Sequence, residues 1–319
     1  MFRSIALALT LMVTSVAADT LKIIVPSDND SYNINARVLG KYLVKHLPNQ
    51  PTLVIQSMPG AASMVAANYL YNHAPKDGSV IGTFYKEIPL VGALGGPNVQ
   101  YDASKFTWIG SNVDGRKDAV IMWCNTDNPK IIGSENYAGV NPAFLVRDLA
   151  KLDAKIVTGY ATTGDARLAL ERKEVDAVVY NLVGIKSQKP NWLKPDSGIK
   201  PCMQFGNGIH RHIEYKDVQT LAEVVQLDTD KTILSIVEAS YAMLRPFVAP
   251  PGIPAKNAQE LREAFVKAVM DSEYLEEARK MNIEVNPIYH DEALNIVKHV
   301  IRVDDAFVEK LKRLNEANR

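Results

Sequence analysis

The chain of 319 residues has no excess of charge of either sign, because 36 Lys and Arg residues balance 36 Asp and Glu residues. No strong electrostatic field is therefore expected, and neither nucleic acid nor an anionic membrane surface is indicated as a partner. After residue 18 the sequence also lacks an apolar run of about 18 residues, the length that spans a bilayer. We therefore expect no direct membrane insertion of the mature chain.

Recognisable catalytic motifs are absent. The sequence contains no Gly-x-Ser-x-Gly elbow, no P-loop, no Gly-x-Gly-x-x-Gly after a strand and no His-Glu-x-x-His. His210 and His212 would face the same way on a strand, but no motif supplies a third metal ligand. We therefore expect surface histidines, no metal site and no cofactor.

Residues 1–18, MFRSIALALTLMVTSVAA, have the order of a secretory signal peptide: Arg3, an apolar run and small residues ending at Ala18. Cleavage after Ala18 is expected to release a periplasmic protein. Loss of Arg3 leaves 35 basic against 36 acidic residues, a net charge of −1. In an oxidising compartment the two cysteines, Cys124 and Cys202, can form one disulfide, and two separate buried thiols are the alternative.

Short apolar strands alternate with amphipathic helices, which predicts an α/β fold with parallel-type sheets and crossover helices. About 300 mature residues favour two lobes over one. In the first part we expect strands at 21–25, 52–56 and 79–84 and helices at 33–47 and from 61 onward. The pattern restarts with strands at 119–124, 130–132, 155–158 and 177–180 and helices at 143–152 and 165–172.

The expected domain boundaries place residues 19–122 and 203–319 in lobe 1 and residues 123–202 in lobe 2. Strands at 119–124 and 201–205 would join the lobes, and a disulfide between Cys124 and Cys202 is feasible if these strands are neighbours. Amphipathic helices at 258–270 and 291–314 are expected to pack on lobe 1.

The segment from Gln56 to Phe84 contains the clearest candidate for ligand binding. Pro59 and Gly60 end a strand, and the small residues Ala61, Ala62 and Ser63 then open a helix that Ser63 can cap. The first N–H groups of a helix have no intrahelical partner and lie at the positive end of its dipole, so they can hold a carboxylate or phosphate. The same residues also fit a plain tight turn.

Three tyrosines are further candidates for ligand contact. In parallel sheets, ligands bind where strands end, and Tyr32, Tyr85 and Tyr180 lie at expected strand-end loops.

Several long stretches resemble the periplasmic substrate-binding proteins of tripartite tricarboxylate transporters, also called Bug-type receptors. The resemblance covers nearly the whole mature chain, and MPGA, APKDG and PFVAPPG are its more specific motifs. The stretches are IIVPSDNDSYNINARVL, MPGAASMVAANYLYNHAPKDGSVIGTF, FTWIGS, VTGYATTGDARLALERKEVDA and RPFVAPPGIP. The resemblance implies a two-lobed periplasmic-binding-protein fold of type II that closes on a small organic anion, commonly a carboxylate.

The resemblance implies ligand contacts from the loop after Pro26, from Ser63 and the amides beside it, and from residues of both lobes. Together with the three tyrosines, the expected ligand-binding set is Ser27, Asp28, Asn29, Ser31, Tyr32, Asn33, Gly60, Ala61, Ala62, Ser63, Thr83, Tyr85, Ser134, Asn136, Thr162, Thr163, Asp165 and Tyr180. Asp165 begins a helix, so a capping role is the alternative for it.

The chain departs from the family pattern at the loop after its first strand. Where the family has two glycines and then an Asp, this chain has Asp28 to Ser31 and then Asn33. Segment 134–137 also lacks Gly-rich character. Two carboxylates beside an anion site oppose a bound carboxylate, so three alternatives stay open. Asp28 and Asp30 point to solvent, or the ligand carries a positive group, or a cation bridges them.

The expected function is an extracytoplasmic receptor that is not an enzyme. It would act as a monomer, bind a small organic anion between its lobes and deliver it to the membrane subunits of a transporter. Two alternatives remain: an extracytoplasmic α/β enzyme of hydrolase type with a carboxylate such as Asp165 as general base, and a ligand sensor for a membrane signalling protein.

Overall fold

The computed structural model describes residues 20–28, 30–96, 98–135, 141–160, 162–205 and 211–316. The expected signal peptide, Asn29, Asn136 and His210 lie outside these residues. No helix in the described ranges is long and apolar enough to cross a membrane. The same ranges contain no group of three or more His, Cys, Asp or Glu side chains that could hold a metal ion.

The first sheet contains six strands in the order β11-β4-β10-β3-β1-β2. β1 (Thr20–Val25) is parallel to β2 (Thr52–Ser57) and to β3 (Val80–Thr83). β10 (Pro246–Ala249) is antiparallel to both β3 and β4 (Thr107–Ser111), and β11 (Ile288–Tyr289) is antiparallel to β4. The sheet is therefore parallel at one side and antiparallel at the other.

Helices cover both faces of the first sheet because alternate side chains of a strand point to opposite faces. Leu21, Ile23 and Val25 of β1 share one core with helices on one face, whereas Ile24 belongs to the core of the other face. The first face is covered by α1 (Ser31–His46), α9 (Ala255–Met270) and α10 (Ser272–Lys280). The second face is covered by α2 (Met64–Asn72), α3 (Ile88–Leu94) and α11 (His290–Val300).

The second sheet contains five strands in the order β7-β6-β8-β5-β9. Their bounds are β7 (Lys155–Tyr160), β6 (Ile131–Glu135), β8 (Ala177–Asn181), β5 (Val120–Cys124) and β9 (Lys200–Gln204). β6 is parallel to β7 and β8, whereas β5 is antiparallel to β8 and β9. One face carries α5 (Thr163–Glu171) and α6 (Leu182–Gln188). The other carries α4 (Pro142–Leu149), α7 (Leu221–Val224), α8 (Asp228–Ser240) and α12 (Asp305–Glu316).

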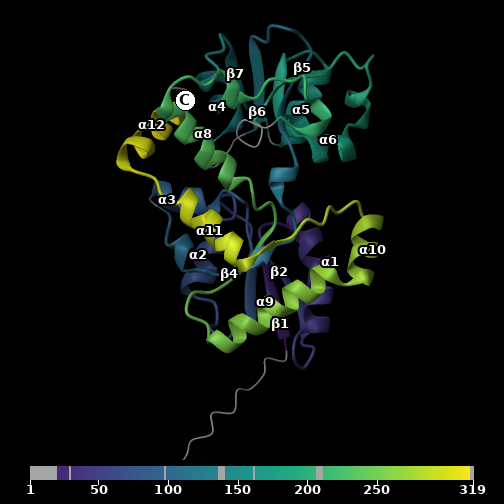
Figure 1. Cartoon of the computed structure of the whole chain (residues 1–319), viewed down its shortest axis with the longest axis vertical. Helices are drawn as coiled ribbons and strands as arrows, with labels where there is room; N and C mark the ends of the chain where they lie inside the picture. Colours follow the sequence, from purple (N-terminus) through teal and green to yellow (C-terminus); the bar gives the residue numbers. More distant parts are fainter. Residues whose placement is uncertain are drawn as a thin grey trace, which may run out of the picture.

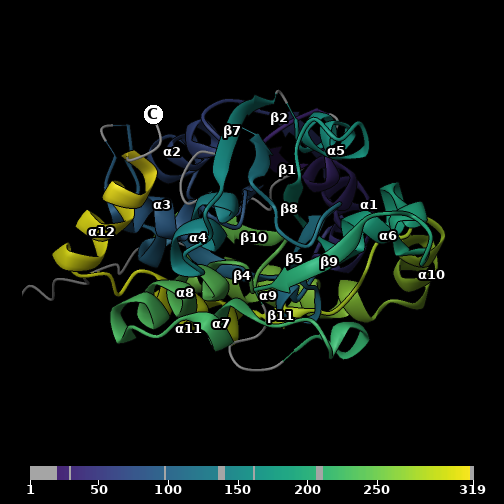
Figure 2. The ribbon, with the colours of Figure 1, turned by 90° about the horizontal axis from the view of Figure 1, so that it is seen from above.

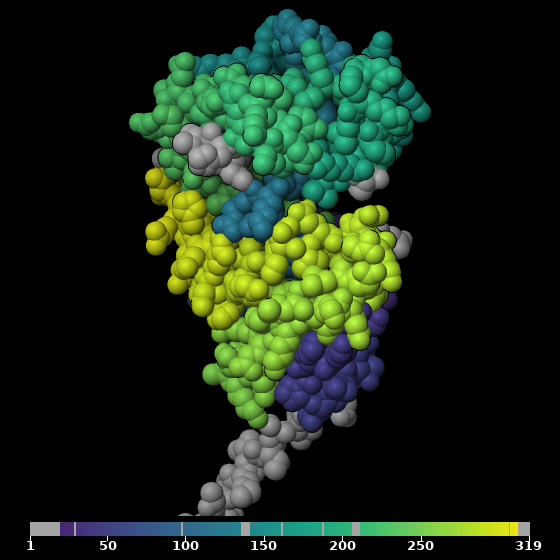
Figure 3. Space-filling view, turned by 45° about the vertical axis from the view of Figure 1, so that its right-hand side comes forward, coloured from purple at the N-terminus to yellow at the C-terminus, as the bar shows by residue number. Residues whose placement is uncertain are grey.

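The two sheets with their helices form two lobes, one above the other in Figure 1. Figure 3 shows the surface hollowed between the teal and green upper lobe and the purple and yellow-green lower lobe. The expected two-lobed α/β fold is confirmed. The expected strands and helices up to residue 270 are present with shifts of a few residues at their ends.

Cys124 of β5 and Cys202 of β9 form a disulfide, with 6.1 Å between their Cα atoms. The prediction that their strands are neighbours is confirmed, because Cys124 pairs with Lys200 in the β5–β9 ladder. The disulfide therefore joins the first and last strands of the second sheet in chain order.

The end of the chain differs from the prediction. The helix expected at 291–314 is two helices, α11 and α12, separated at residues 301–304. α11 packs on the first sheet through β4, but α12 contacts α4 and α8, so the expectation that this whole segment packs on lobe 1 is wrong. Figure 1 shows α12 beside α4 and α8, and Figure 2 shows the same lobe from above. The expected boundaries at residues 122 and 203 stay a prediction.

Candidate functional site

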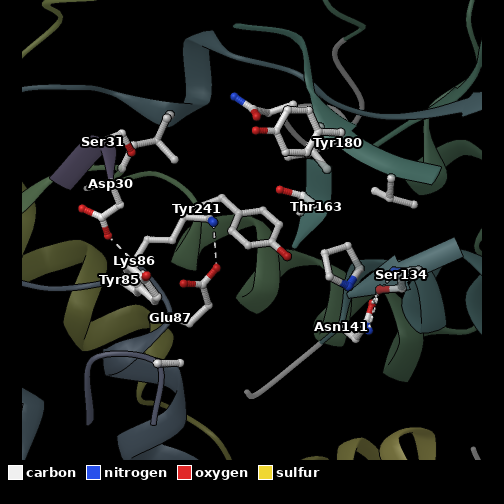
Figure 4. Close-up of a pocket in the computed structure, with 18 of the residues that line it drawn as sticks. Asp30, Ser31, Tyr85, Lys86, Glu87, Ser134, Asn141, Thr163, Tyr180 and Tyr241 are labelled. Carbon is white, nitrogen blue, oxygen red and sulfur yellow. Dashed lines mark hydrogen bonds and ion pairs between the residues drawn. The ribbon is translucent and has the colours of Figure 1, made fainter. Parts of the chain in front are cut away.

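A cavity of about 480 Å³ lies between the two sheets. Most of its lining comes from the loops after β1, β2 and β3 in one lobe and after β6, β7 and β8 in the other, and segments 115–120 and 241–245 supply the rest. The loops lie at carboxyl ends of parallel strands, where α/β sheets place their ligands. Figure 4 shows the two groups facing each other, with Asp30, Tyr85 and Lys86 opposite Thr163, Tyr180 and Ser134.

The turn before α2 presents backbone to this cavity. Ala61, Ala62 and Ser63 all have positive φ angles, of 44°, 49° and 75°. L-residues avoid this region, and such strain persists mainly at functional sites. Ala61 and Ala62 line the cavity, and within the described ranges their main-chain N–H groups have no intramolecular acceptor. The turn therefore places at the cavity wall two residues whose main-chain N–H groups have no acceptor within the described ranges.

Ser63 has a supporting position. Its side chain is buried, and it makes no side-chain capping bond to α2. Ser63 is the N-cap residue of α2 by position, but the prediction that its side chain caps the helix is wrong. Its Oγ accepts a hydrogen bond from the Tyr85 main-chain N–H at 3.0 Å and so joins the turn after β2 to the loop after β3.

The two aspartates of the loop after β1 differ in their position relative to the cavity. Asp28 is exposed and does not line the cavity, as the solvent alternative requires. Asp30 does line the cavity and is the N-cap of α1, where its Oδ1 accepts from the Asn33 N–H at 2.9 Å. Its Oδ2 accepts from the Tyr85 hydroxyl at 3.3 Å. The carboxylate of Asp30 is therefore held by two donors of its own lobe.

Two tyrosines form the adjoining part of the wall. The rings of Tyr32 and Tyr85 lie 4.9 Å apart between centroids, and the Tyr32 hydroxyl accepts from the Lys86 main-chain N–H at 3.2 Å. Burial is the main cause that raises the pKa of both phenols above its usual value near 10. Both hydroxyls are therefore neutral at physiological pH and can act as hydrogen-bond donors and acceptors.

In the second lobe the cavity wall includes the starts of two helices. The Ser134 hydroxyl contacts the Asn141 side chain, which caps α4 by accepting from the Ala143 N–H at 2.9 Å. At α5, Thr162 and Asp165 form a reciprocal capping box that leaves Thr163 at the cavity. Asp165 is exposed and does not line the cavity, so its placement agrees with the capping alternative.

Three cationic side chains line the cavity, and sequence reasoning missed all three. Lys86 pairs with Glu87 at 2.7 Å, a pair drawn in Figure 4. Arg245 lies over the Tyr32 ring at 4.4 Å and donates from Nη2 to the Ser31 hydroxyl at 2.7 Å. Arg167 of α5 is 5% exposed and lies 4.1 Å from the Tyr180 ring centroid. No local pattern distinguishes these residues from an ordinary polar helix face or loop.

Asp118 and Tyr241 lie in the cavity wall as well. Burial raises the pKa of the Asp118 carboxyl, although donors from Asn181, Val183 and Ala119 oppose the shift. The Tyr241 hydroxyl is buried and has no hydrogen-bond partner among the described residues. It therefore remains available as a donor to a ligand.

The cavity brings together about half of the expected set. Residues of that set that line it are Ser31, Tyr32, Ala61, Ala62, Tyr85, Ser134, Thr163 and Tyr180. Those that do not line it are Ser27, Asp28, Asn33, Gly60, Ser63, Thr83, Thr162 and Asp165. Asn33, for example, is buried and donates from Nδ2 to the Ser27 carbonyl at 2.9 Å, which supports the loop from behind. Thr83 is buried within β3.

The fold is that of periplasmic solute-binding proteins. A TctC solute-binding protein from Polaromonas is similar over 92% of this chain and 98% of its own, with 15% identity and a TM-score of 0.66. MatC from Rhodopseudomonas palustris with bound malate is similar over 93% and 99%, with 17% identity and a TM-score of 0.60. An adipate-bound R. palustris protein is similar over 92% and 96%, with 16% identity and a TM-score of 0.62.

No protein-family model and no curated protein sequence matches the chain. At identities of 15–17% the structural likeness establishes the fold and leaves the ligand to be argued from the cavity. TctC-type structures are the group that the sequence motifs resemble, so the observed fold agrees with the fold that the resemblance implies.

Proposed function

We propose that this protein is a periplasmic solute receptor that binds a small organic anion, a carboxylate, between its lobes and delivers it to a membrane transporter of the tripartite tricarboxylate type. The observation that carries the proposal is the cavity of about 480 Å³, to which the strand-end loops of both sheets contribute. A ligand held by both lobes stabilises their closed arrangement, which a transporter can distinguish from the empty receptor.

The chemistry of the cavity wall supports an anionic ligand. The strained turn at Ala61 and Ala62 supplies main-chain donors, and Lys86, Arg167 and Arg245 supply positive charge. Such preorganised donors gain strength when lobe closure removes water. Malate and adipate in two structures of the same fold are small carboxylates, which supports this class of ligand.

Native mass spectrometry of the protein purified from its own organism tests the proposal. The expected result is one small organic anion bound per monomer and released intact on denaturation. Turnover of that compound by the pure protein would instead favour a hydrolase-type enzyme. A protein that retains nothing and is not stabilised by any anion in a thermal-shift panel would contradict the proposal.

The proposed location has its own test. Cell fractionation should place the protein in the periplasm, and the mature N-terminus should be Asp19, as cleavage after Ala18 requires. A full-length chain in the cytoplasm would contradict this part of the proposal.

A further inference from the structure

The C-terminal helix α12 is attached to a different lobe from the helix that precedes it. α11 packs on β4 of the first sheet, whereas α12 contacts α4 and α8, which cover the second sheet. Figure 1 shows the chain passing from the lower to the upper lobe between α11 and α12. Residues 301–304 therefore connect the lobes, in addition to segments 112–119 and 241–245.

The connection at 301–304 is short, because hydrogen bonds hold both of its ends. The Ile301 and Arg302 N–H groups donate to carbonyls of α11, at 2.9 and 3.2 Å. The Asp304 carboxylate accepts from the Phe307 N–H at 2.7 Å and so caps the start of α12. Even when fully extended, the five Cα-to-Cα steps from the end of α11 to the start of α12 span at most about 17 Å. The lobes can therefore separate only a limited distance on this side before α12 has to leave the second lobe.

Apolar and charged contacts anchor α12 to the second lobe. Phe307 and Leu311 are 7% and 1% exposed and belong to an apolar cluster with residues of α4 and α8. The Lys310 ammonium forms an ion pair with Asp230 in the first turn of α8 and donates to the Thr229 hydroxyl at 3.2 Å. Because Lys310 is partly exposed, burial of the apolar side chains is the larger stabilising contribution.

The same apolar cluster includes side chains from helices of the first lobe. Leu90 of α3 and Val300 of α11 are 2% and 1% exposed and belong to it, although both helices cover the first sheet. α8 contacts α3 and α11 as well as α12. α12 therefore takes part in packing that joins the two lobes on one side of the molecule.

The position of α12 relative to the cavity separates its effect from direct ligand contact. None of the described residues of α12 lines the cavity. Any effect of α12 on a ligand must therefore act through the positions of the lobes. Its contacts with α4 and α8 occur in the arrangement in which both lobes line the cavity. They therefore favour this arrangement over one with the lobes further apart.

From these contacts we infer that α12 holds the lobes in the arrangement that forms the cavity, and thereby raises the affinity of the receptor for its solute. A receptor whose binding-competent arrangement is only partly populated binds more weakly by that fraction. Loss of the α12 contacts should lower the fraction, although every residue that lines the cavity is unchanged. The part of the inference that concerns affinity rests on the proposed function, and the part that concerns the lobes does not.

Leu311→Ala in the full-length chain tests the inference, because it removes buried methyl groups from the contact between α12 and the second lobe. Spin labels on Lys76→Cys in the first lobe and Asp153→Cys in the second occupy exposed positions. Pulsed electron paramagnetic resonance then measures the distance between the lobes in the absence of ligand. We expect the distance distribution of Leu311→Ala to shift to longer values than that of the labelled protein with Leu311 intact.

Ile185→Ala is the matched control, because leucine and isoleucine lose the same number of atoms on truncation to alanine. Ile185 of α6 is 0% exposed, belongs to the core on the opposite face of the second sheet and does not line the cavity. This variant should lower the stability of the second lobe without changing the distance distribution. An equal shift in Leu311→Ala and Ile185→Ala would overturn the inference, because it would show a general loosening of the lobe.

Lys310→Gln is a milder variant that removes the ion pair with Asp230 and keeps the apolar contacts of α12. It should shift the distances in the same direction as Leu311→Ala and by a smaller amount. Lys298→Gln on the exposed face of α11 is its control and should leave the distances unchanged. Unchanged distances in both folded α12 variants would overturn the inference.

Calorimetry with adipate and malate as probes measures the effect on affinity. For the probe that binds the wild type more tightly, we expect about 5-fold weaker binding by Leu311→Ala and unchanged binding by Ile185→Ala. Unchanged affinity in Leu311→Ala would overturn the link between α12 and binding. If neither probe binds the wild type, the result counts against the proposed function, whereas the distance measurement still decides whether α12 holds the lobes.

Discussion

The Ser63 hydroxyl accepts a hydrogen bond from the Tyr85 main-chain N–H at 3.0 Å. The two residues belong to loops that follow different parallel strands, β2 and β3. The first loop lines the cavity through Ala62, next to Ser63, and the second loop lines it through Tyr85. The bond is partly buried, and it joins the strained turn to the tyrosine wall. Ser63 therefore supports the binding surface without lining it.

Replacing Ser63 by alanine should lower stability and ligand affinity together. The variant leaves the partly buried Tyr85 N–H without its acceptor, which costs about 1 kcal/mol of the free energy of unfolding. Affinity for the retained ligand should fall about 3- to 10-fold, because the Ala61 and Ala62 amides lose part of their fixed position. Urea unfolding and calorimetry measure the two effects. As a control, Ser79→Ala removes a hydroxyl in an exposed turn and should change neither stability nor affinity. Unchanged affinity in Ser63→Ala would show that Ser63 does not support the binding site.

Replacing Asp30 by asparagine should strengthen anion binding. Asparagine is an equally good N-cap, so α1 should keep its start, while the cavity loses one negative charge. We expect about 3- to 5-fold tighter binding of a carboxylate at low salt, with the gain reduced at high salt. Asp28→Asn is the matched control, because Asp28 is exposed and outside the cavity. Weaker binding by Asp30→Asn would show that the ligand carries a positive group near this carboxylate.

Reduction of the Cys124–Cys202 disulfide should destabilise the folded protein. The bridge spans 78 residues of sequence, and loop-closure entropy gives it a contribution of about 4 kcal/mol. Urea unfolding with and without a phosphine reductant should show a difference of this order in the free energy of unfolding. The double variant Cys124→Ser with Cys202→Ser should be insensitive to the reductant, and an equal response of both proteins would show that the reductant acts elsewhere.

The Asp271 carboxylate should contribute to stability only above acidic pH. Lys45 at 2.9 Å is the main cause that lowers the pKa of Asp271 from its usual 3.8 to about 2, with help from His46 at 2.8 Å and the Glu273 N–H. Because the folded-state pKa is below the unfolded-state value, this stabilisation is complete above about pH 4 and is lost as pH falls toward 2.

Urea unfolding between pH 5 and pH 2 checks this dependence. Asp271→Asn keeps an N-cap for α10 but has no titrating group, so the stability difference between the wild type and the variant should shrink as the pH falls. A difference that is constant across this range would contradict the assignment.

Local patterns in the chain were sufficient to predict most of the two sheets. Short apolar runs predict strands β1 to β3 and β5 to β9, and amphipathic segments predict most of the helices between them. Both patterns can be read because the period of apolar residues depends only on neighbouring positions. The antiparallel strands β4, β10 and β11 and the helices α3, α6, α7, α8 and α10 were not predicted, because their position in the fold depends on contacts with distant segments.

The sequence by itself determined that this is a two-lobed α/β protein with a small-residue turn after β2, since alternation of strand and helix and the MPGAAS motif can be read from adjacent residues. Only the tertiary structure decided which charges meet in the cavity. Arg245 reaches Ser31 across 214 residues, and Arg167 faces the cavity only because α5 packs on the second sheet with that side inward. The positions of both arginine side chains depend on packing between distant segments and on the desolvation that accompanies it, so the local pattern of residues does not predict them.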